Sequence, residues 1–192
     1  MFPIDDFRDC LTRVGNVLTE CGLKYYITGG AAFIAYGDPR TTQDLDLVVD
    51  EAHISEHLST IMQRFKEAQF LLTEQTVRDA VRRKRQFQLI DSVTAMKVDI
   101  YPHDNVPGAI TRYRMIEVFP GAEFPIASYP DLIVSKLVRI SKGSHRSRRD
   151  VRQLMRTVSP EDKSQAFEFA QDLGLTQLFD EVLAEPDEFD LD

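Results

Sequence analysis

The chain has 192 residues, of which 43% are hydrophobic, and it carries a formal net charge of −8. This length and composition suffice for one domain with a helical extension, or for two small domains, without a disulfide staple. No apolar run approaches the roughly 20 residues that a membrane helix needs, and the negative charge argues against a surface that coats nucleic acid non-specifically. We therefore expect a soluble cytoplasmic protein with no membrane partner.

Residues 4–22 carry apolar side chains at three- and four-residue spacing, which predicts an amphipathic helix that packs on a sheet. The first residues, MFPIDDFRDC, open with acids rather than with a basic segment and an apolar run, so we expect no signal peptide. Cys10 and Cys21 lie eleven residues apart on this helix, about 16 Å at the standard rise, which is too far for a disulfide. We expect both cysteines to be core residues in a reducing compartment.

A short strand over residues 24–28 is followed by the paired glycines Gly29 and Gly30 and then by AAFIAYG, which is rich in helix formers. Because glycine lacks a Cβ, phosphate oxygens can approach the backbone here, and the N–H groups that open a helix favour anions. The pattern predicts a phosphate cradle at Gly29 and Gly30. Paired glycines also commonly form plain turns, which is the alternative interpretation.

The next segment, GDPRTTQ, places Arg40, Thr41 and Thr42 between the glycines and the following strand. A triphosphate that extends from the glycines would pass along this loop, and an arginine could donate two hydrogen bonds to its oxygens. We expect nucleotide contacts from Arg40 and Thr42. The alternative is a Gly-Asp-Pro turn followed by solvated side chains.

Residues 44–49, DLDLVV, predict a buried strand that carries Asp44 and Asp46. Successive side chains of a strand point to opposite faces, so the two carboxylates share one face while the leucines enter the core. Asp99 follows the same alternation in MKVDIYP. Carboxylates brought together repel one another unless they bind a cation, and Mg²⁺ prefers oxygen ligands and bridges substrate phosphates. We predict a metal site at Asp44, Asp46 and Asp99; solvated acids at strand ends are the alternative.

The remaining elements of the core are predicted from periodicity, with helices over residues 53–67 and 75–84 and strands over residues 86–91, 95–101 and 113–119. From Tyr129 onward the pattern is wholly helical. We therefore divide the chain into an α/β core over residues 1–128, a helical subdomain over residues 129–185 and an acidic tail over residues 186–192, which we expect to be disordered.

The first helix of the subdomain has an apolar stripe, and Lys136 occupies one of its positions in the segment DLIVSKL. A lysine there either extends its stem to solvent or reaches a buried anion. Asp150, which flanks the next apolar stripe, could pair with Lys136 or Arg139. For Asp150 we expect a structural ion pair rather than a catalytic role.

Basic residues concentrate in two segments of this acidic chain, Arg78–Arg85 and Lys142–Arg156. Such patches predict local anion binding, with an RNA backbone, a triphosphate or an acidic partner as the ligand. Solvated helix faces are the alternative, because most charge runs lie on such faces.

The order of strand, Gly29-Gly30, short helix, Asp44-x-Asp46 strand and a further acid-bearing strand resembles the nucleotidyltransferase superfamily, which has a polymerase-beta-like fold. The form GGAAFIAYGDPRTTQDLDL is similar to the small bacterial branch with the AbiE-type toxins and related transferases of toxin–antitoxin pairs. It also looks like the aminoglycoside and lincosamide nucleotidyltransferases. The resemblance covers roughly residues 20–155. The superfamily's serine after the first glycine is Gly30 here, so a nucleotide contact by that hydroxyl is absent or replaced.

This resemblance implies an α/β (α+β) fold, with a mixed sheet of the nucleotidyltransferase type flanked by helices and a C-terminal helical subdomain. It implies transfer of a nucleoside monophosphate from a nucleoside triphosphate, such as ATP, to a hydroxyl of RNA such as tRNA, or of a protein. Asp44 and Asp46 would bind two Mg²⁺ or Mn²⁺ ions, and Asp99 would ligate the catalytic one and help to draw the proton from the acceptor hydroxyl. Lys136 would point towards the nucleotide phosphates. An antitoxin protein would be a further partner.

Two other functions remain open from the sequence. The chain could be a non-catalytic nucleotide-binding or partner-binding module of the same fold, although a domain without metal chemistry has little physical use for clustered carboxylates. It could also be an aminoglycoside-type enzyme, which needs an acidic pocket for a cationic substrate. Asp104, Glu123 or the acidic tail could contribute to such a pocket.

Overall fold

The computed structural model describes residues 4–36, 42 and 44–186. Arg40 and Thr41, and the predicted tail from residue 187 onward, lie outside the described residues. The chain divides into two compact units, Met1–Asp104 with Ile110–Ile126 and Asn105–Ala109 with Ala127–Asp192. The boundaries predicted from the sequence, 1–128 and 129–185, remain our proposal for its domains.

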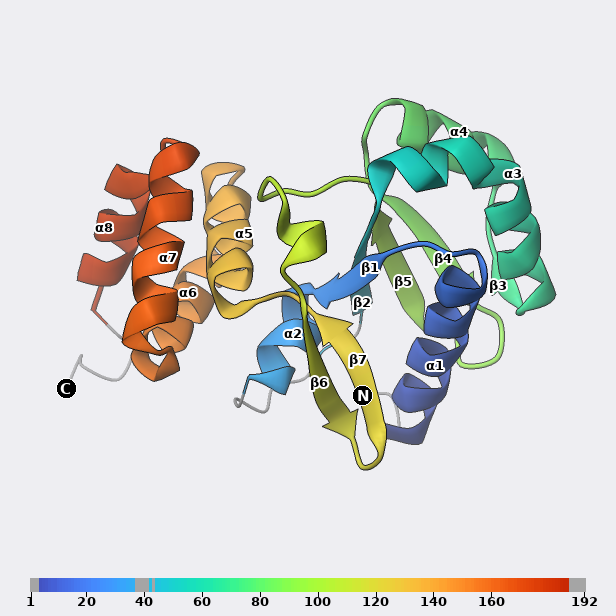
Figure 1. The fold of residues 1–192 in the computed structure, drawn as a ribbon, viewed down its shortest axis with the longest axis horizontal. Helices are drawn as coiled ribbons and strands as arrows, with labels where there is room; N and C mark the ends of the chain where they lie inside the picture. The colour runs from blue at the N-terminus through green and yellow to red at the C-terminus, as the bar shows by residue number, and fades with distance from the viewer. Residues whose placement is uncertain (1–3, 37–41, 43, 187–192) are drawn as a thin grey trace. The chain divides into compact units, whose positions relative to one another are not determined.

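The first unit is built on seven strands: β1 Tyr25–Thr28, β2 Asp44–Val49, β3 Phe70–Leu71, β4 Phe87–Asp91, β5 Lys97–Tyr101, β6 Arg114–Phe119 and β7 Ala122–Ile126. Its helices are α1 Ile4–Glu20, α2 Gly29–Ala35, α3 Glu51–Glu67 and α4 Glu74–Arg82, and a short 3-10 helix covers Ala109–Thr111. The strands form one sheet in the order β3-β4-β5-β2-β1-β7-β6 (Figure 1). Because parallel and antiparallel pairs share this sheet, the structure confirms the predicted mixed α/β fold class.

Strand β7 was not predicted, because Pro125 lies inside it and a proline cannot donate a hydrogen bond to a neighbouring strand. In the structure, β7 lies between β1 and β6. Its parallel pairing with β1 is short and has Ile27 and Ile126 in register, whereas its antiparallel pairing with β6 is longer. The other predicted elements of this unit end within two residues of the observed ones.

One face of the sheet is apolar, and α1 contacts it. Leu45 of β2 and Leu89 of β4 are fully buried on this face. Both are register partners of the same residue of β5, Val98, which lies between them. Asp91, two residues further along β4, shares the face and is also fully buried, and it binds the guanidinium of Arg13 on α1. Side chains that alternate with these residues, including Asp46, therefore lie on the opposite face of the sheet.

Asp91 is a structural carboxylate with several hydrogen-bond donors. It accepts hydrogen bonds from Arg13, from the Thr94 hydroxyl at 2.5 Å and from the Val93 N–H at 3.0 Å. Burial alone would raise the pKa of Asp91, but these hydrogen bonds outweigh it and hold the pKa below its usual value. A carboxyl group with a lowered pKa stabilises the folded state above its unfolded-state pKa, and this contribution is lost as the pH falls through the lowered value.

We expect Asp91→Asn to lower the free energy of unfolding at pH 7 by about 3 kcal/mol, because it leaves the charge of Arg13 without its partner. The difference from wild type should shrink as the pH falls below about 4. Urea unfolding at pH 7 and at pH 3 would measure both effects. Glu67→Gln, which removes an exposed partner of Arg64, should leave the stability nearly unchanged. An Asp91→Asn effect of the same size at both pH values would contradict the assignment.

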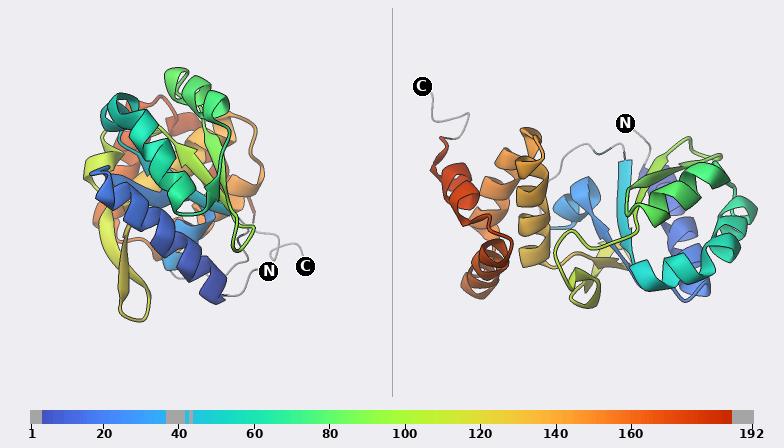
Figure 2. Two further views of the ribbon diagram at one scale, coloured as in Figure 1. Left: turned by 90° about the vertical axis from the view of Figure 1, so that its right-hand side faces the viewer. Right: turned by 90° about the horizontal axis from the view of Figure 1, so that it is seen from above.

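Helices α5 Tyr129–Ser141, α6 Arg146–Thr157, α7 Pro160–Asp172 and α8 Thr176–Ala184 make up most of the second unit. They pack on one another (Figure 2). Ser159 caps the N-terminus of α7: its hydroxyl accepts a hydrogen bond from the Asp162 N–H at 3.1 Å, and Pro160 follows it as the first residue of the helix. Phe179 of α8 is fully buried and stacks on Phe167, with the ring centroids 4.5 Å apart. No helix in the described part of the chain combines the length and the apolar composition that spanning a membrane requires.

The two cysteines are free thiols, with Cys10 buried and Cys21 partly exposed. Burial, followed by the nearby negative charge of Asp91, raises the pKa of Cys10 to about 12, and burial also raises the pKa of Cys21. Since the thiolate is the reactive form, we expect iodoacetamide to label Cys21 first in the native protein and Cys10 only after denaturant is added. Peptide mass spectrometry would measure the order. Equal labelling of both thiols without denaturant would contradict it.

Candidate active site

Two of the three predicted carboxylates lie directly beside each other in the sheet. Asp46 of β2 and Asp99 of β5 are register partners on adjacent parallel strands. Residues paired in this way project from the same face of a sheet, and Asp44 shares that face because it precedes Asp46 by two residues. Asp44 is itself in register with Lys97. The structure therefore brings Asp46 and Asp99 together and places Asp44 one step further along the same face.

The three carboxylates differ in exposure and in hydrogen bonding. Asp46 is buried, with 8% of its surface exposed, and its Oδ1 accepts a hydrogen bond from the Tyr101 hydroxyl at 3.1 Å. Asp99 is partly exposed, and its Oδ1 accepts a hydrogen bond from Nε2 of Gln88 at 2.9 Å. Asp44 is exposed at the start of β2. Tyr101 and Gln88, which occupy neighbouring positions of the sheet, thus donate hydrogen bonds to Asp46 and Asp99, respectively.

Neither Tyr101 nor Gln88 was predicted from the sequence. The signal that could have identified Tyr101 is its position two residues after Asp99, which puts it on the same face of the same strand. Gln88 could be found only once β4 was known to pair with β5, because it is the register partner of Asp99. The missing information is strand pairing, which a single sequence does not provide.

The donor types at this site suit a hard divalent cation. Carboxylate oxygens are the ligands that Mg²⁺ prefers, and Mn²⁺ accepts the same set. Among the residues that the structure describes, however, no group of three or more His, Cys, Asp or Glu side chains lies close enough together to hold a metal ion. Asp44, Asp46 and Asp99 offer the oxygen donors that such an ion prefers, and they share one face of the sheet. Metal binding by these three residues stays a prediction.

Gly29 accommodates the carboxylate of Asp46. A Cβ built on Gly29 would lie 1.9 Å from Oδ2 of Asp46, far inside any possible contact distance. Gly29 also has a φ of +66°, in the left-handed region that side chains disfavour. Gly30 follows as a buried residue of α2. A carboxylate of the site thus uses the space left by the absent Cβ of Gly29. The phosphate contacts of Gly29 and Gly30 stay a prediction.

The loop between the glycines and β2 is described only in part. Thr42 donates a hydrogen bond from its hydroxyl to the backbone carbonyl of Asp44 at 3.1 Å, which links the loop to the start of the carboxylate strand. Arg40 lies outside the described residues. The predicted nucleotide contacts of Arg40 and Thr42 are therefore still predictions.

Lys136 forms a buried ion pair within the helical unit. Its Nζ donates a hydrogen bond to Oδ2 of Asp150 at 2.6 Å, and the side chains are 4% and 9% exposed, respectively. This is the pairing that the sequence suggested for Asp150. A buried lysine needs a compensating negative charge, which Asp150 supplies. A contact between Lys136 and a nucleotide phosphate remains a prediction.

The basic segments make ion pairs with acidic residues. Arg82 lies 2.6 Å from Asp79, and Lys84 lies 2.7 Å from Glu51. Arg152 lies 2.5 Å from Glu185. These pairs reduce the positive charge available at both segments, so the arrangement agrees with solvated helix faces as well as with anion binding.

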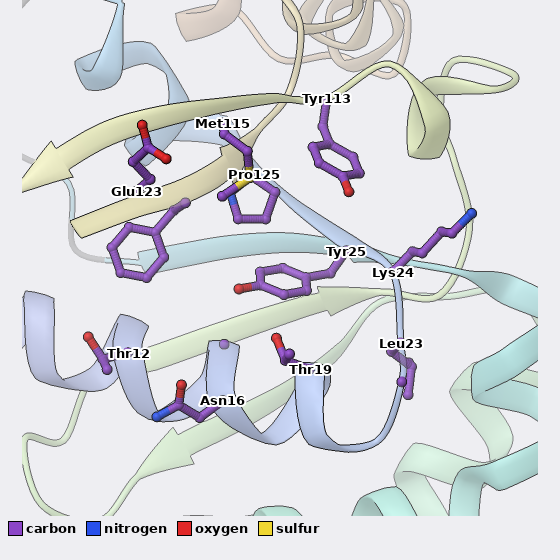
Figure 3. A pocket seen from close by; sticks show the side chains of 13 residues that line it. Thr12, Asn16, Thr19, Leu23, Lys24, Tyr25, Tyr113, Met115, Glu123 and Pro125 are labelled. Carbon is purple, nitrogen blue, oxygen red and sulfur yellow. The ribbon is translucent and has the colours of Figure 1, made fainter. Parts of the chain in front are cut away.

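A cavity of about 470 Å³ lies between α1 and the β6–β7 hairpin (Figure 3). Tyr25, Thr19, Tyr113 and Glu123 are among its lining residues. Burial raises the pKa of Tyr25, which also shares a hydrogen bond with Thr19. The three carboxylates of the candidate site do not line this cavity.

The aminoglycoside-type alternative needs an acidic pocket, for which Asp104 and Glu123 were suggested. Glu123 lines the cavity beside α1, whereas Asp104 is absent from the described residues that line it. Asp104 instead accepts hydrogen bonds from the Tyr26 hydroxyl at 3.3 Å and from the Ile110 N–H at 3.1 Å. Asp104 and Glu123 therefore do not line this cavity together.

Three solved structures share the fold. The antibiotic-resistance factor ANT(2'')-Ia aligns with a TM-score of 0.58 and 13% identity, over 93% of this chain and 99% of that one. A nucleotidyltransferase from Thermotoga maritima aligns with a TM-score of 0.50 and 22% identity, over 74% of this chain and 90% of that one. An antigenic nucleotidyltransferase-like protein from Paracoccidioides brasiliensis aligns with a TM-score of 0.51 and 17% identity, over 90% and 91%, respectively. At sequence identities this low, the structural similarity shows a shared fold and carries no conclusion about function.

Sequence comparison is more specific. No curated protein sequence matches the chain significantly. A family model described as "Nucleotidyl transferase AbiEii toxin, Type IV TA system" matches residues 14–185, which is most of the chain. The resemblance read from the glycine and carboxylate motifs is therefore confirmed, and the chain belongs to the AbiEii family of nucleotidyltransferase toxins of type IV toxin–antitoxin systems.

Proposed function

We propose that the protein is a metal-dependent nucleotidyltransferase that moves a nucleoside monophosphate from a nucleoside triphosphate to a hydroxyl of RNA, such as tRNA, or of a protein. The observation that supports this most directly is the register pair of Asp46 and Asp99 on one face of the sheet. Membership of the AbiEii family supports nucleotide transfer as the reaction class.

In this proposal Asp44, Asp46 and Asp99 hold Mg²⁺ or Mn²⁺. When bound, the metal supplies positive charge that stabilises the attacking and leaving oxygens of a phosphoryl transfer. Asp99, which is more exposed than Asp46, would also accept the proton of the acceptor hydroxyl. Asp46 is the more buried of the two carboxylates. The Tyr101 hydroxyl donates a hydrogen bond to it, and the missing Cβ of Gly29 leaves room for it.

The nucleotide would lie along the backbone of Gly29 and Gly30, with Arg40, Thr42 and Lys136 as further contacts to its phosphates. An RNA acceptor would use the basic segments Arg78–Arg85 and Lys142–Arg156. We further propose that the protein is the toxin of a pair and has an antitoxin as its partner. These assignments come from the sequence pattern and from the family.

Label transfer tests the function. The protein is incubated with each α-labelled nucleoside triphosphate, with Mg²⁺ or Mn²⁺, and with separate acceptors: cellular RNA, cellular protein and an aminoglycoside. Label on RNA or protein with the wild type, and none with Asp46→Asn, would support the proposal. Label on the aminoglycoside alone would favour the small-molecule alternative.

Calorimetry with a nucleoside triphosphate and metal separates the remaining alternative. Nucleotide binding without any label transfer would favour a non-catalytic binding module. If no label moved and no metal-dependent nucleotide binding occurred, the proposed function would be wrong.

A further inference from the structure

We propose that Tyr101 and Gln88 are positioning residues that fix the orientation of Asp46 and Asp99 for metal binding. Neither residue would touch the metal or the nucleotide; each would act through the carboxylate to which it donates. This inference rests on the proposed function, because it assigns a role within the same site.

Tyr101 fixes the carboxylate that is more deeply buried. Asp46 and Asp99 are register partners, so Tyr101, two residues after Asp99, lies diagonally across from Asp46 on the same face. Its hydroxyl donates to Oδ1 of Asp46 at 3.1 Å. Gly29, which lacks a Cβ, leaves room for the same carboxylate at Oδ2. The hydroxyl of Tyr101 thus fixes one oxygen of Asp46 and leaves the other for the metal.

Gln88 acts on Asp99 from the other side of β5. It is the register partner of Asp99 on the antiparallel strand β4, so both side chains leave the same face of the sheet. Its Nε2 donates to Oδ1 of Asp99 at 2.9 Å. A carboxylate with one oxygen engaged by a donor presents its other oxygen in a defined direction, as outer-shell partners do at metal sites.

The two donors are uncharged, and this matters for a cation site. A guanidinium or an ammonium would orient a carboxylate but would also neutralise the charge that attracts the metal. The opposite face of the sheet shows that case, where Arg13 binds the buried Asp91. A phenol and a carboxamide orient Asp46 and Asp99 without supplying a competing positive charge.

The test uses Tyr101→Phe and Gln88→Met in the full chain, since each removes the donor and keeps a side chain of similar size. Two variants serve as matched controls. Tyr113→Phe removes a tyrosine hydroxyl from the cavity beside α1. Gln63→Met removes a glutamine hydrogen bond to a carboxylate, that of Glu67 at 3.0 Å on α3. The measurements are Mn²⁺ affinity by electron paramagnetic resonance, with a non-hydrolysable nucleoside triphosphate analogue present, and label transfer across a range of Mn²⁺ concentrations.

We expect Tyr101→Phe and Gln88→Met each to weaken Mn²⁺ binding by about 10- to 100-fold, the usual effect of losing an outer-shell partner. Transfer should approach the wild-type rate at saturating Mn²⁺, because the ligands themselves remain. Both control variants should bind Mn²⁺ like the wild type. A purely structural role would instead lower the melting temperature without a shift in Mn²⁺ affinity.

Two negative outcomes are distinguishable. If the wild type binds Mn²⁺ and transfers label while Tyr101→Phe and Gln88→Met match it in Mn²⁺ affinity, the positioning role is overturned and the proposed function stands. If the wild type itself neither binds Mn²⁺ nor transfers label, both proposals are overturned.

Discussion

Replacing Asp46 with asparagine is expected to lower nucleotide transfer on the order of a thousandfold. A metal that neutralises developing charge contributes several kcal/mol to transition-state stabilisation, and each 1.4 kcal/mol or so corresponds to a factor of ten in rate. Asparagine has nearly the same shape as aspartate and can still accept the hydrogen bond from Tyr101. The change therefore removes the negative charge from a buried position of the site while the surrounding structure is retained.

Label transfer at saturating nucleotide, together with Mn²⁺ binding, would measure this effect. Asp5→Asn is the matched control, because it removes the same charge from an exposed carboxylate on α1 that is paired with Arg8 at 3.5 Å, outside the site and outside both basic segments. That variant should keep wild-type transfer. Wild-type activity in Asp46→Asn, with the fold intact by circular dichroism, would exclude Asp46 from the reaction.

The face of the sheet that carries the site could be predicted from sequence alternation alone. In DLDLVV the leucines are fully buried and the aspartates share the other face, as the period of a strand requires. Alternation alone does not predict that Asp46 meets Asp99; the prediction that they share a site came from the order of the elements and the types of residue they carry. These residues are more than fifty positions apart, and their contact depends on the parallel pairing of β2 with β5.

Other features depend on long-range geometry that local patterns do not encode. Strand β7 could not be predicted from the sequence, because it contains Pro125 and an interior proline argues against a strand. For Gly29, the pattern suggested a surface that phosphate approaches, whereas in the structure a carboxylate from the neighbouring strand lies within reach of its missing Cβ. The proximity of Gly29 to Asp46 could be found only from the three-dimensional fold, and the contact of Gly29 with phosphate stays a prediction.

Gly29→Ala is expected to abolish most transfer although Gly29 has no side chain to take part in it. The new Cβ would lie 1.9 Å from Oδ2 and 2.6 Å from Cγ of Asp46, so the carboxylate must leave its position. Alanine at a φ of +66° also strains the backbone by about 1–2 kcal/mol. We therefore expect transfer and Mn²⁺ affinity to fall nearly as far as in Asp46→Asn, with a lower melting temperature as well.

Gly174→Ala separates the two causes, because Gly174 has a φ of +67° and nothing within 4 Å of the position its Cβ would occupy. It carries the same backbone strain without displacing a carboxylate. Thermal unfolding should show that Gly174→Ala loses stability, because backbone strain destabilises it as it does Gly29→Ala. Gly174→Ala should nevertheless keep wild-type transfer and Mn²⁺ binding. If Gly29→Ala kept its activity, Asp46 could move without loss of function, and the close fit of Gly29 to Asp46 would have no part in the reaction. If both variants lost activity equally, backbone strain and not displacement of Asp46 would be the cause.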